Sequence, residues 1–166
     1  MTANEFLDDL GAFMKAATKN LRLPVHPTKE NKKPEDRAPE VYKMRLPDKK
    51  SYQDKAPYLF NRIVLIEDHQ HPGERGECKC TVCTSFCVYC DDEMQGALHL
   101  LNLMEDVRQE ILRTQVISNM YQIDMDEGMQ FAIYDNQPVP FFIGEAVSVW
   151  KIPTIEREVS TKWLRR

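Results

Sequence analysis

The sequence has no continuous apolar run that approaches the roughly 18 residues needed to cross a bilayer. We therefore expect no transmembrane helix and no membrane partner. The start, MTANEFLDDLGAF, lacks a basic region followed by a continuous apolar stretch, so it does not predict a secretory signal. Both absences favour a reducing cytosol, where cysteines are more often thiols or metal ligands than disulfides.

Sequence signatures of catalysis are also missing. There is no glycine-rich phosphate loop and no serine nucleophile elbow, and glycine occurs at only 6 of 166 positions. A nucleophilic cysteine would need a partner base and a third group that orients it, and the sequence singles out neither. The pairs Asp91/Asp92 and Asp124/Asp126 fit helix-start and turn chemistry. We therefore predict that the protein is not an enzyme and has no cofactor.

Charge, by contrast, is present and unevenly distributed. Of all residues, 42% are apolar and 29% charged, as expected for one globular domain. Residues 15–62 carry thirteen Lys/Arg against six Asp/Glu, whereas residues 67–135 carry four against fourteen. This segregation suits a subunit that meets partners through faces of opposite sign. No basic patch interleaved with aromatics occurs, so sequence-specific nucleic-acid binding is not indicated.

The hydrophobic pattern predicts two helices and several strands. An apolar stripe predicts a helix over 4–21 with Asn4 as N-cap, and a second over 94–114. Residues 24–57 hold six of the ten prolines and read as a Pro/Lys-rich loop or arm, and 154–166 as a C-terminal tail. Alternating or β-branched stretches predict strands over Val41–Leu46, Tyr58–Glu67, Cys78–Cys90, Tyr121–Met125, Met129–Tyr134 and Phe141–Ile152, with a loop over 68–77. We predict a single α+β domain over 1–166, its largely antiparallel sheet packed against two main helices.

All five cysteines lie in ECKCTVCTSFCVYCDDE, residues 77–93. Two C-x2-C pairs can bind zinc, but such pairs are normally separated by about 12–20 residues. Here only TSF intervenes, with no Gly or Pro to turn the chain. Period-two alternation instead predicts a half-buried strand whose even positions, from Cys78 to Cys90, face the core. Residues three apart in a strand face opposite sides, so this favours a strand over a zinc site made of Cys80, Cys83, Cys87 and Cys90.

The region 40–158 resembles small tail-completion proteins of tailed bacteriophages. The resemblance rests on RLPDKKSYQDKAPYLFNRIVLIED, on FCVYCDDEMQGALHLLNLMEDVRQEIL and on PVPFFIGEAVSVWKIPTIEREV. Cysteine density and the lysine-rich insert before residue 40 depart from the family pattern. The matching positions are Gln95, Gly96, Leu101, Asn102, Leu103, Glu105 and Arg108, followed by Pro138, Pro140, Phe141, Phe142, Gly144, Trp150 and Pro153.

The resemblance implies a tail terminator or related neck protein. Such a subunit assembles in the bacterial host cytoplasm into a ring, usually a hexamer, and resides in the virion at the head–tail junction. The ring caps the tail tube, and the sheath of contractile tails, and joins it to the head connector. DNA passes through the lumen of the ring without sequence-specific binding.

Several residues are candidates for these roles. An acidic lumen would repel DNA phosphate, so the loop with Asp124, Asp126 and Glu127 is a candidate lining. The arm with Lys49 and Lys50 is a candidate contact with a neighbouring subunit, as is Trp163 in the tail. We expect structural roles for Gly96 and Gly144 at close approaches, for Trp150 beside Phe142 in the core, and for Pro153 as the strand end.

Three alternatives stay open. The first is another neck component, such as a head–tail connector or stopper, or a tail-tube protein. The second is a small zinc-binding regulatory module that uses the four cysteines named above. The third is a thiol redox protein, which requires a cysteine of lowered pKa.

Overall fold

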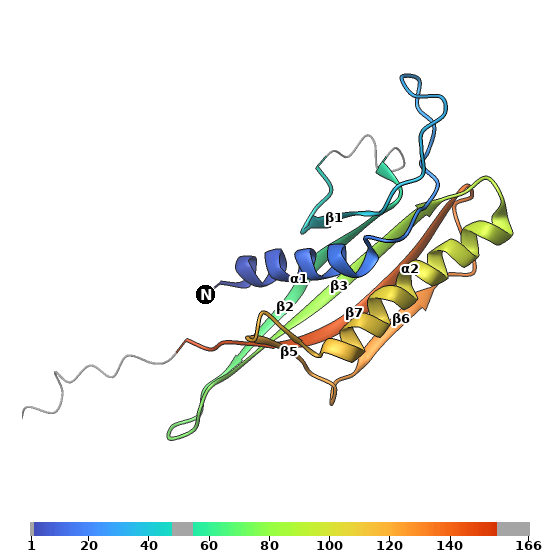
Figure 1. The fold of residues 1–166 in the computed structure, drawn as a ribbon. Helices are drawn as coiled ribbons and strands as arrows, with labels where there is room; N and C mark the ends of the chain where they lie inside the picture. Colours follow the sequence, from blue (N-terminus) through green and yellow to red (C-terminus); the bar gives the residue numbers. More distant parts are fainter. Residues whose placement is uncertain (1, 48–54, 156–166) are drawn as a thin grey trace, which may run out of the picture.

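The computed structural model describes residues 2–47 and 55–155, and it confirms a single-domain α+β fold (Figure 1). Two helices pack against a mixed, curled sheet of seven strands. Within the described residues, no helix is both long and apolar enough to cross a membrane. The elements are α1 (Ala3–Thr18), β1 (Glu40–Lys43), β2 (Tyr58–His69), β3 (Glu77–Tyr89), α2 (Glu93–Thr114), β4 (Val116–Ile117), β5 (Tyr121–Ile123), β6 (Met129–Ile133) and β7 (Phe141–Ile152).

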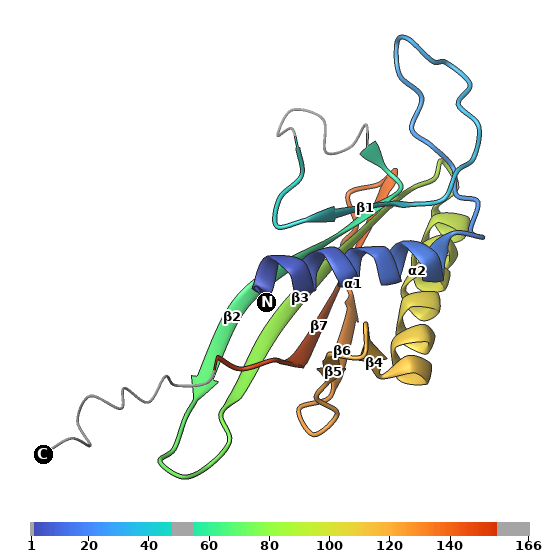
Figure 2. The same cartoon turned by 60° about the vertical axis from the view of Figure 1, so that its left-hand side comes forward.

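The long strands β3 and β7 form the middle of the sheet. The strand order is β1-β2-β3-β7-β5-β4, and β6 pairs with another part of β7. Every pair is antiparallel except β1 with β2, so the expected antiparallel character is confirmed with one parallel exception. Both helices lie on one side of the sheet (Figures 1 and 2). The main core fills the space between them and the sheet.

Helix α1 begins earlier than its apolar stripe indicates. Thr2, not Asn4, is the N-cap: its Oγ1 accepts a hydrogen bond from the Glu5 N–H at 3.3 Å, and its own N–H donates to Glu5 Oε2 at 2.6 Å. This reciprocal capping box satisfies backbone donors that a helix start leaves unpaired. The helix ends at Thr18 rather than at residue 21, and there the Thr18 hydroxyl donates to the Met14 carbonyl.

The structure corrects the ends of two predicted strands and adds a third strand that was not predicted. β1 stops at Lys43 instead of Leu46, because Met44 has a φ of 59°, a left-handed conformation that cannot continue a strand. β2 runs on to His69, so the hairpin loop spans only residues 70–76. The two-residue strand β4 was not predicted, because so short a segment has no periodicity of its own.

The cysteine segment is strand β3, as predicted, but both of its faces are covered. Its even-numbered side chains enter the main core, among them Cys80, Val82 and Phe86. On the opposite face, Cys87 and Tyr89 belong to a second buried cluster. That cluster also contains Leu46, Ala56, Tyr58 and Phe141.

The positions expected to have structural roles lie where α2 approaches β7. A Cβ on Gly96 would lie 2.1 Å from the Phe142 ring, and one on Gly144 would lie 2.5 Å from Met104 Sδ. Both glycines therefore permit close approach between helix and strand. Trp150 is fully buried in the same core cluster as Phe142, and β7 ends at Ile152, directly before Pro153.

Candidate functional site

The two ends of the sheet differ in shape. A loop over residues 24–36 projects from one end, and the β2–β3 hairpin tip and the loop 124–128 lie at the other (Figures 1 and 2). Between residues 15 and 45 there are nine Lys/Arg and four Asp/Glu. Six acidic side chains are exposed at the hairpin end: Glu67, Asp68, Glu74, Glu77, Asp126 and Glu127.

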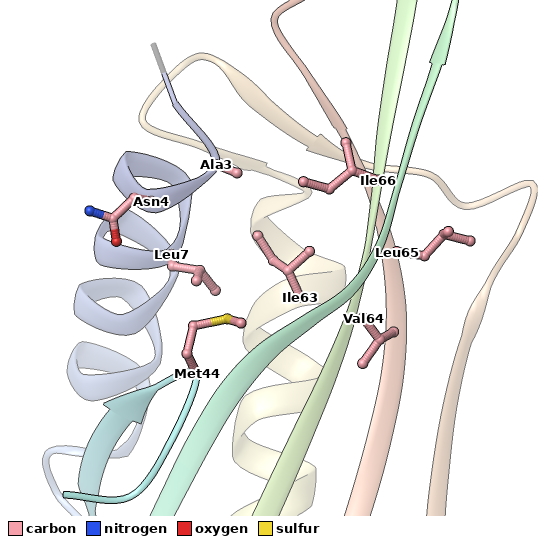
Figure 3. Close-up of a pocket in the computed structure, with 8 residues that line it drawn as sticks. All are labelled: Ala3, Asn4, Leu7, Met44, Ile63, Val64, Leu65 and Ile66. Atoms are coloured by element: carbon pink, nitrogen blue, oxygen red, sulfur yellow. The ribbon is translucent and has the colours of Figure 1, made fainter.

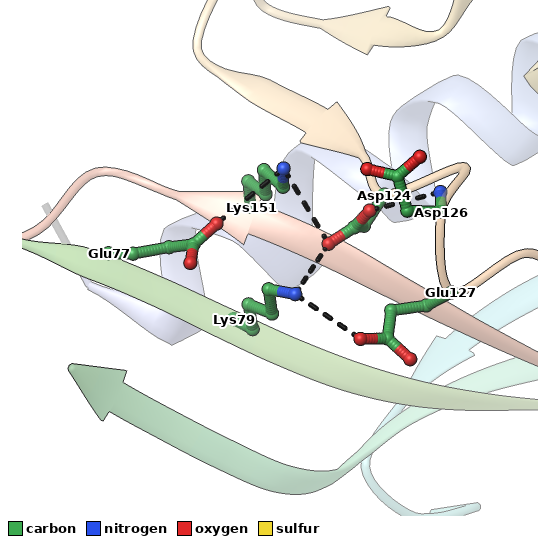
Figure 4. A network of polar contacts seen from close by, with 6 residues as sticks. All are labelled: Glu77, Lys79, Asp124, Asp126, Glu127 and Lys151. Atoms are coloured by element: carbon green, nitrogen blue, oxygen red, sulfur yellow. Dashed lines mark hydrogen bonds and ion pairs between the residues drawn. The ribbon is translucent and has the colours of Figure 1, made fainter.

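A polar network joins strands β3 and β7 to the loop between β5 and β6 at the acidic end (Figure 4). Lys79 of β3 and Lys151 of β7 are direct cross-strand partners, a like-charge pairing that is unfavourable on its own. Asp124 offsets the repulsion between the two lysines, because its Oδ2 lies 2.8 Å from Lys79 Nζ and 3.7 Å from Lys151 Nζ. Two further carboxylates pair with these lysines. Glu127 Oε1 lies 3.3 Å from Lys79 Nζ, and Glu77 Oε1 lies 3.5 Å from Lys151 Nζ.

Asp124 is a buried carboxylate within the network rather than an exposed charge on the surface. Its side chain is only 1% exposed, and its Oδ1 accepts the Asp126 N–H at 3.2 Å. The contact with the Lys79 ammonium lowers the pKa of Asp124 below its ordinary value, although burial opposes this shift. The same contact raises the pKa of Lys79. Of the three acidic residues expected to line a lumen, only Asp126 and Glu127 are therefore exposed on the subunit.

Replacing Asp124 by asparagine is expected to lower the free energy of unfolding by about 2 kcal/mol. The amide preserves the shape of the turn but removes the buried carboxylate that the two lysines share, leaving each with one exposed carboxylate partner. Urea denaturation of both proteins measures the difference. The matched change Asp126→Asn, at an exposed position of the same loop, should alter stability by less than about 0.5 kcal/mol. Equal losses in the two variants would contradict a special role for Asp124.

The stability of the wild-type protein is expected to fall in acid partly through Asp124. A carboxylate with a lowered folded-state pKa stabilises the fold above its ordinary pKa of 3.8. That contribution is lost as the pH falls through the folded-state pKa. Unfolding free energies of wild type and Asp124→Asn, measured from pH 6 down to pH 2, should therefore run parallel above pH 3.8 and converge below it. Curves that stay parallel below pH 3.8 would assign the acid sensitivity to other groups.

The cysteines do not converge on a metal site. β3 places Cys80 in the main core and Cys87 in the cluster on the opposite face. All five are free thiols and buried. Throughout residues 2–47 and 55–155, no group of three or more His, Cys, Asp or Glu side chains is arranged to hold a metal ion. The alternative Cys80–Cys83–Cys87–Cys90 zinc set is therefore not brought together by the fold.

Burial also works against thiolate chemistry. Burial is the main cause that raises the pKa of Cys78 to about 12, and of Cys80 and Cys87 each to about 11. A redox-active cysteine needs the opposite shift. These three thiols are protonated at neutral pH and act as small apolar side chains.

We expect the native protein to react slowly with a thiol reagent such as Ellman's reagent at pH 8, because its five cysteines are at most 8% exposed. In denaturant, all five should react at the rate of free cysteine. Absorbance at 412 nm over time, in buffer and in guanidinium chloride, measures both rates. One thiol that reacts rapidly in the folded protein would instead support the redox alternative.

The projecting loop is pinned at its base. Leu23 and Arg37 exchange backbone hydrogen bonds of 2.9 and 3.1 Å. The Arg37 guanidinium also donates to the carbonyls of Lys55 at 2.8 Å and Pro57 at 3.1 Å. The predicted arm over residues 24–57 is thus not one free segment, since it includes β1. The part that projects carries exposed Lys29, Lys32 and Lys33 at its tip.

A shallow apolar groove of about 420 Å³ lies between α1 and β2 (Figure 3). Ile63 and Ile66 point towards α1, whereas Leu65 points away from it. Val64, Leu65 and Ile66 are each about half exposed, at 50%, 49% and 47%. Sequence reasoning missed this surface, because the β-branched and aromatic residues of YLFNRIVLIE predict a strand but do not indicate which of its side chains stay exposed. The lining consists of Ala3, Asn4, Leu7, Met44 and residues 63–66.

Three of the predicted contact residues, Lys49, Lys50 and Trp163, lie outside the described residues. No protein-family model matches the sequence, and no curated protein matches it.

Proposed function

We propose that this chain is a non-enzymatic structural protein of the neck of a tailed bacteriophage. In this role it is a tail terminator that forms a ring, as a hexamer, on the tail tube. The ring caps the tube, and the sheath of a contractile tail, and joins it to the head connector. It resides in the virion and assembles in the cytoplasm of the bacterial host.

The two unlike ends of the subunit support this proposal most directly. A protein that sits between the tube and the head connector needs two end surfaces that do not bind the same partner. Here a loop projects at one end, and the tight β2–β3 hairpin tip and the loop 124–128 lie at the other. The two ends therefore differ in shape, which allows each to contact a different partner.

Some of the residues that carry the family resemblance occupy central positions of the fold, whereas Gln95, Leu101, Asn102 and Pro138 are exposed. Gly96 of the Gln-Gly step lies against Phe142 of the P-x-P-F-F motif. Leu103 and Trp150 are fully buried in the main core. These motifs therefore specify how α2 packs on β7, which supports a shared fold rather than a chance match of surface residues.

The acidic loop supports a passage for DNA in the proposed ring. Asp126 and Glu127 are exposed on the loop between β5 and β6. If this loop faces the lumen, its charge repels the DNA phosphates and prevents DNA from adhering to the wall. No sequence-specific contact is required for this role.

Deletion of the gene from a phage or prophage that encodes it tests the function. Loss of a terminator should give tails of unregulated length that are not joined to heads, seen by negative-stain electron microscopy. Restoring the intact gene should restore joined particles. Normal-length tails without heads would instead favour a connector or stopper, and a complete absence of tails would favour a tail-tube protein. Unchanged infectious particles would contradict all neck and tail roles.

A further inference from the structure

The outer half of β2 is an open sheet edge. β1 pairs with β2 only from Tyr58 to Asn61. From Arg62 to His69, β3 lies on one side of β2, and among the described residues no strand lies on the other. Unpaired backbone groups at an edge are a template for a further strand.

The middle of this open edge is apolar. Three consecutive aliphatic side chains, Val64 to Ile66, are about half exposed there. Ile63 and Ile66 point towards α1 (Figure 3), and the shallow groove between α1 and β2 adds Leu7 and Met44 to the apolar surface. A long edge with exposed aliphatic side chains associates with other strands unless something covers it.

The two ends of the open edge carry charges of opposite sign. Its sequence over residues 62–68 is RIVLIED, so a cation precedes four aliphatic residues and two carboxylates follow them. Arg62, Glu67 and Asp68 are all exposed. Neither Arg62 nor Glu67 forms an ion pair with another residue of the described part of the chain. The edge therefore presents charge at each end that is available to a partner.

This order of charges is complementary to an antiparallel copy of itself. When two copies of the edge run in opposite directions with their aliphatic segments side by side, Arg62 of each copy lies beside Glu67 and Asp68 of the other. Cross-strand neighbours of opposite charge stabilise a sheet, and here they occur twice. Parallel pairing would instead place Arg62 against Arg62 and the carboxylates against one another. The charges therefore select an antiparallel contact with the same edge.

We propose that the outer edge of β2 pairs with the same edge of a second copy of this chain, antiparallel and around a two-fold axis. The two sheets then continue into one another, and the α1 helices of both copies lie on the same side. The aliphatic side chains of each copy cover the open groove of the other. Because few residues meet, the buried area is at the small end of protein interfaces, and we expect a dimer that dissociates on dilution.

This dimer is distinct from the ring of the proposed function and does not rest on it. Subunits of a cyclic ring meet through two different surfaces, whereas a two-fold contact uses the same surface twice. The pairing of β2 edges is therefore a property of the free chain, in which it covers an apolar edge.

Light scattering of the full-length protein over a dilution series tests for the dimer. We expect the mass to rise from that of one chain to that of two between about 1 µM and about 500 µM. Ile66→Asp should weaken association at least tenfold, because it places a charge inside the apolar contact. Ile133→Asp is the matched control: Ile133 is 45% exposed on β6, at the opposite edge of the sheet, and its replacement should leave association unchanged.

A charge exchange tests the antiparallel arrangement itself. Arg62→Glu places acidic side chains opposite one another, and Glu67→Arg places two arginines opposite one another. Each variant alone should therefore associate at least tenfold more weakly than the wild-type protein. An equal mixture of the two should recover association as a heterodimer, because both cross-strand pairs are again of opposite charge. Native mass spectrometry distinguishes the heterodimer from the two homodimers.

Three outcomes would overturn the inference. The mass of one chain at every concentration would show that the edges do not pair. A mixture that associates no better than each charge variant alone would contradict the antiparallel arrangement. Association that continues beyond two chains, or that Ile133→Asp abolishes, would indicate a contact between two different surfaces. Since that last result would agree with a ring, the dimer and the neck assignment can fail separately.

Discussion

Replacement of Trp150 by alanine is expected to lower the free energy of unfolding by about 4 kcal/mol. The indole is fully buried and lies 5.7 Å from the Phe6 ring, which itself lies 5.0 Å from the Tyr121 ring. It thus connects β7 to α1 and β5. Its Nε1–H donates to Ser148 Oγ at 2.9 Å, so the variant also leaves a buried hydroxyl without this partner. For a domain of this size, the melting temperature should fall by roughly 10 °C.

The neighbouring Val147→Ala is the control for Trp150→Ala. Val147 lies on the same strand but is 40% exposed, so its truncation should cost less than about 1 kcal/mol. Chemical denaturation and thermal melting of both variants measure the contrast. A loss below 2 kcal/mol for Trp150→Ala would show that the core does not depend on this contact.

Gly96→Ala is expected to destabilise the protein by about 2 kcal/mol, although alanine favours helices. The new methyl group would lie 2.1 Å from a carbon of the Phe142 ring, and that ring is only 3% exposed. A clash this short lies at the upper end of the overpacking range, about 3 kcal/mol, and exceeds the gain in helix propensity of about 1 kcal/mol by about 2 kcal/mol. Urea denaturation measures the net effect.

Gly11→Ala provides the opposite result within the same molecule. Gly11 is also inside a helix, but a Cβ there would lie 3.7 Å from Val41 Cγ1, an ordinary contact. The change should therefore stabilise the protein by about 0.5–1 kcal/mol. Shortening the obstructing ring through Phe142→Leu should recover part of the Gly96→Ala loss. Stabilisation by both glycine replacements would contradict the close approach of α2 to β7.

Local sequence rules predicted the elements whose limits are set by nearby residues. The bounds of β7, Phe141–Ile152, are those predicted, because prolines bracket a run of strand-forming residues. The C-terminal limit of α2 at Thr114 was also predicted. Where a special conformation ends an element, as at Met44 in β1, the sequence contained no turn residue that announced it.

Features that depend on long-range contacts were not predictable in this way. Alternation in β3 predicted one buried face, but the second face is covered by Leu46, Tyr58 and Phe141 from distant segments. Asp124 was assigned to an exposed turn from its neighbours alone. Its burial follows from the register that places Lys79 opposite Lys151, and that register cannot be read from the loop. The open edge of β2 likewise follows from the short length of β1.

Negative-stain imaging of particles labelled with an antibody to this chain is the most direct test of the proposed function. The particles are purified from a phage or prophage that encodes the chain. The account predicts label at the neck, between head and tail. Purified intact particles that carry no label, and that lack the chain by mass spectrometry, would contradict its place in the virion.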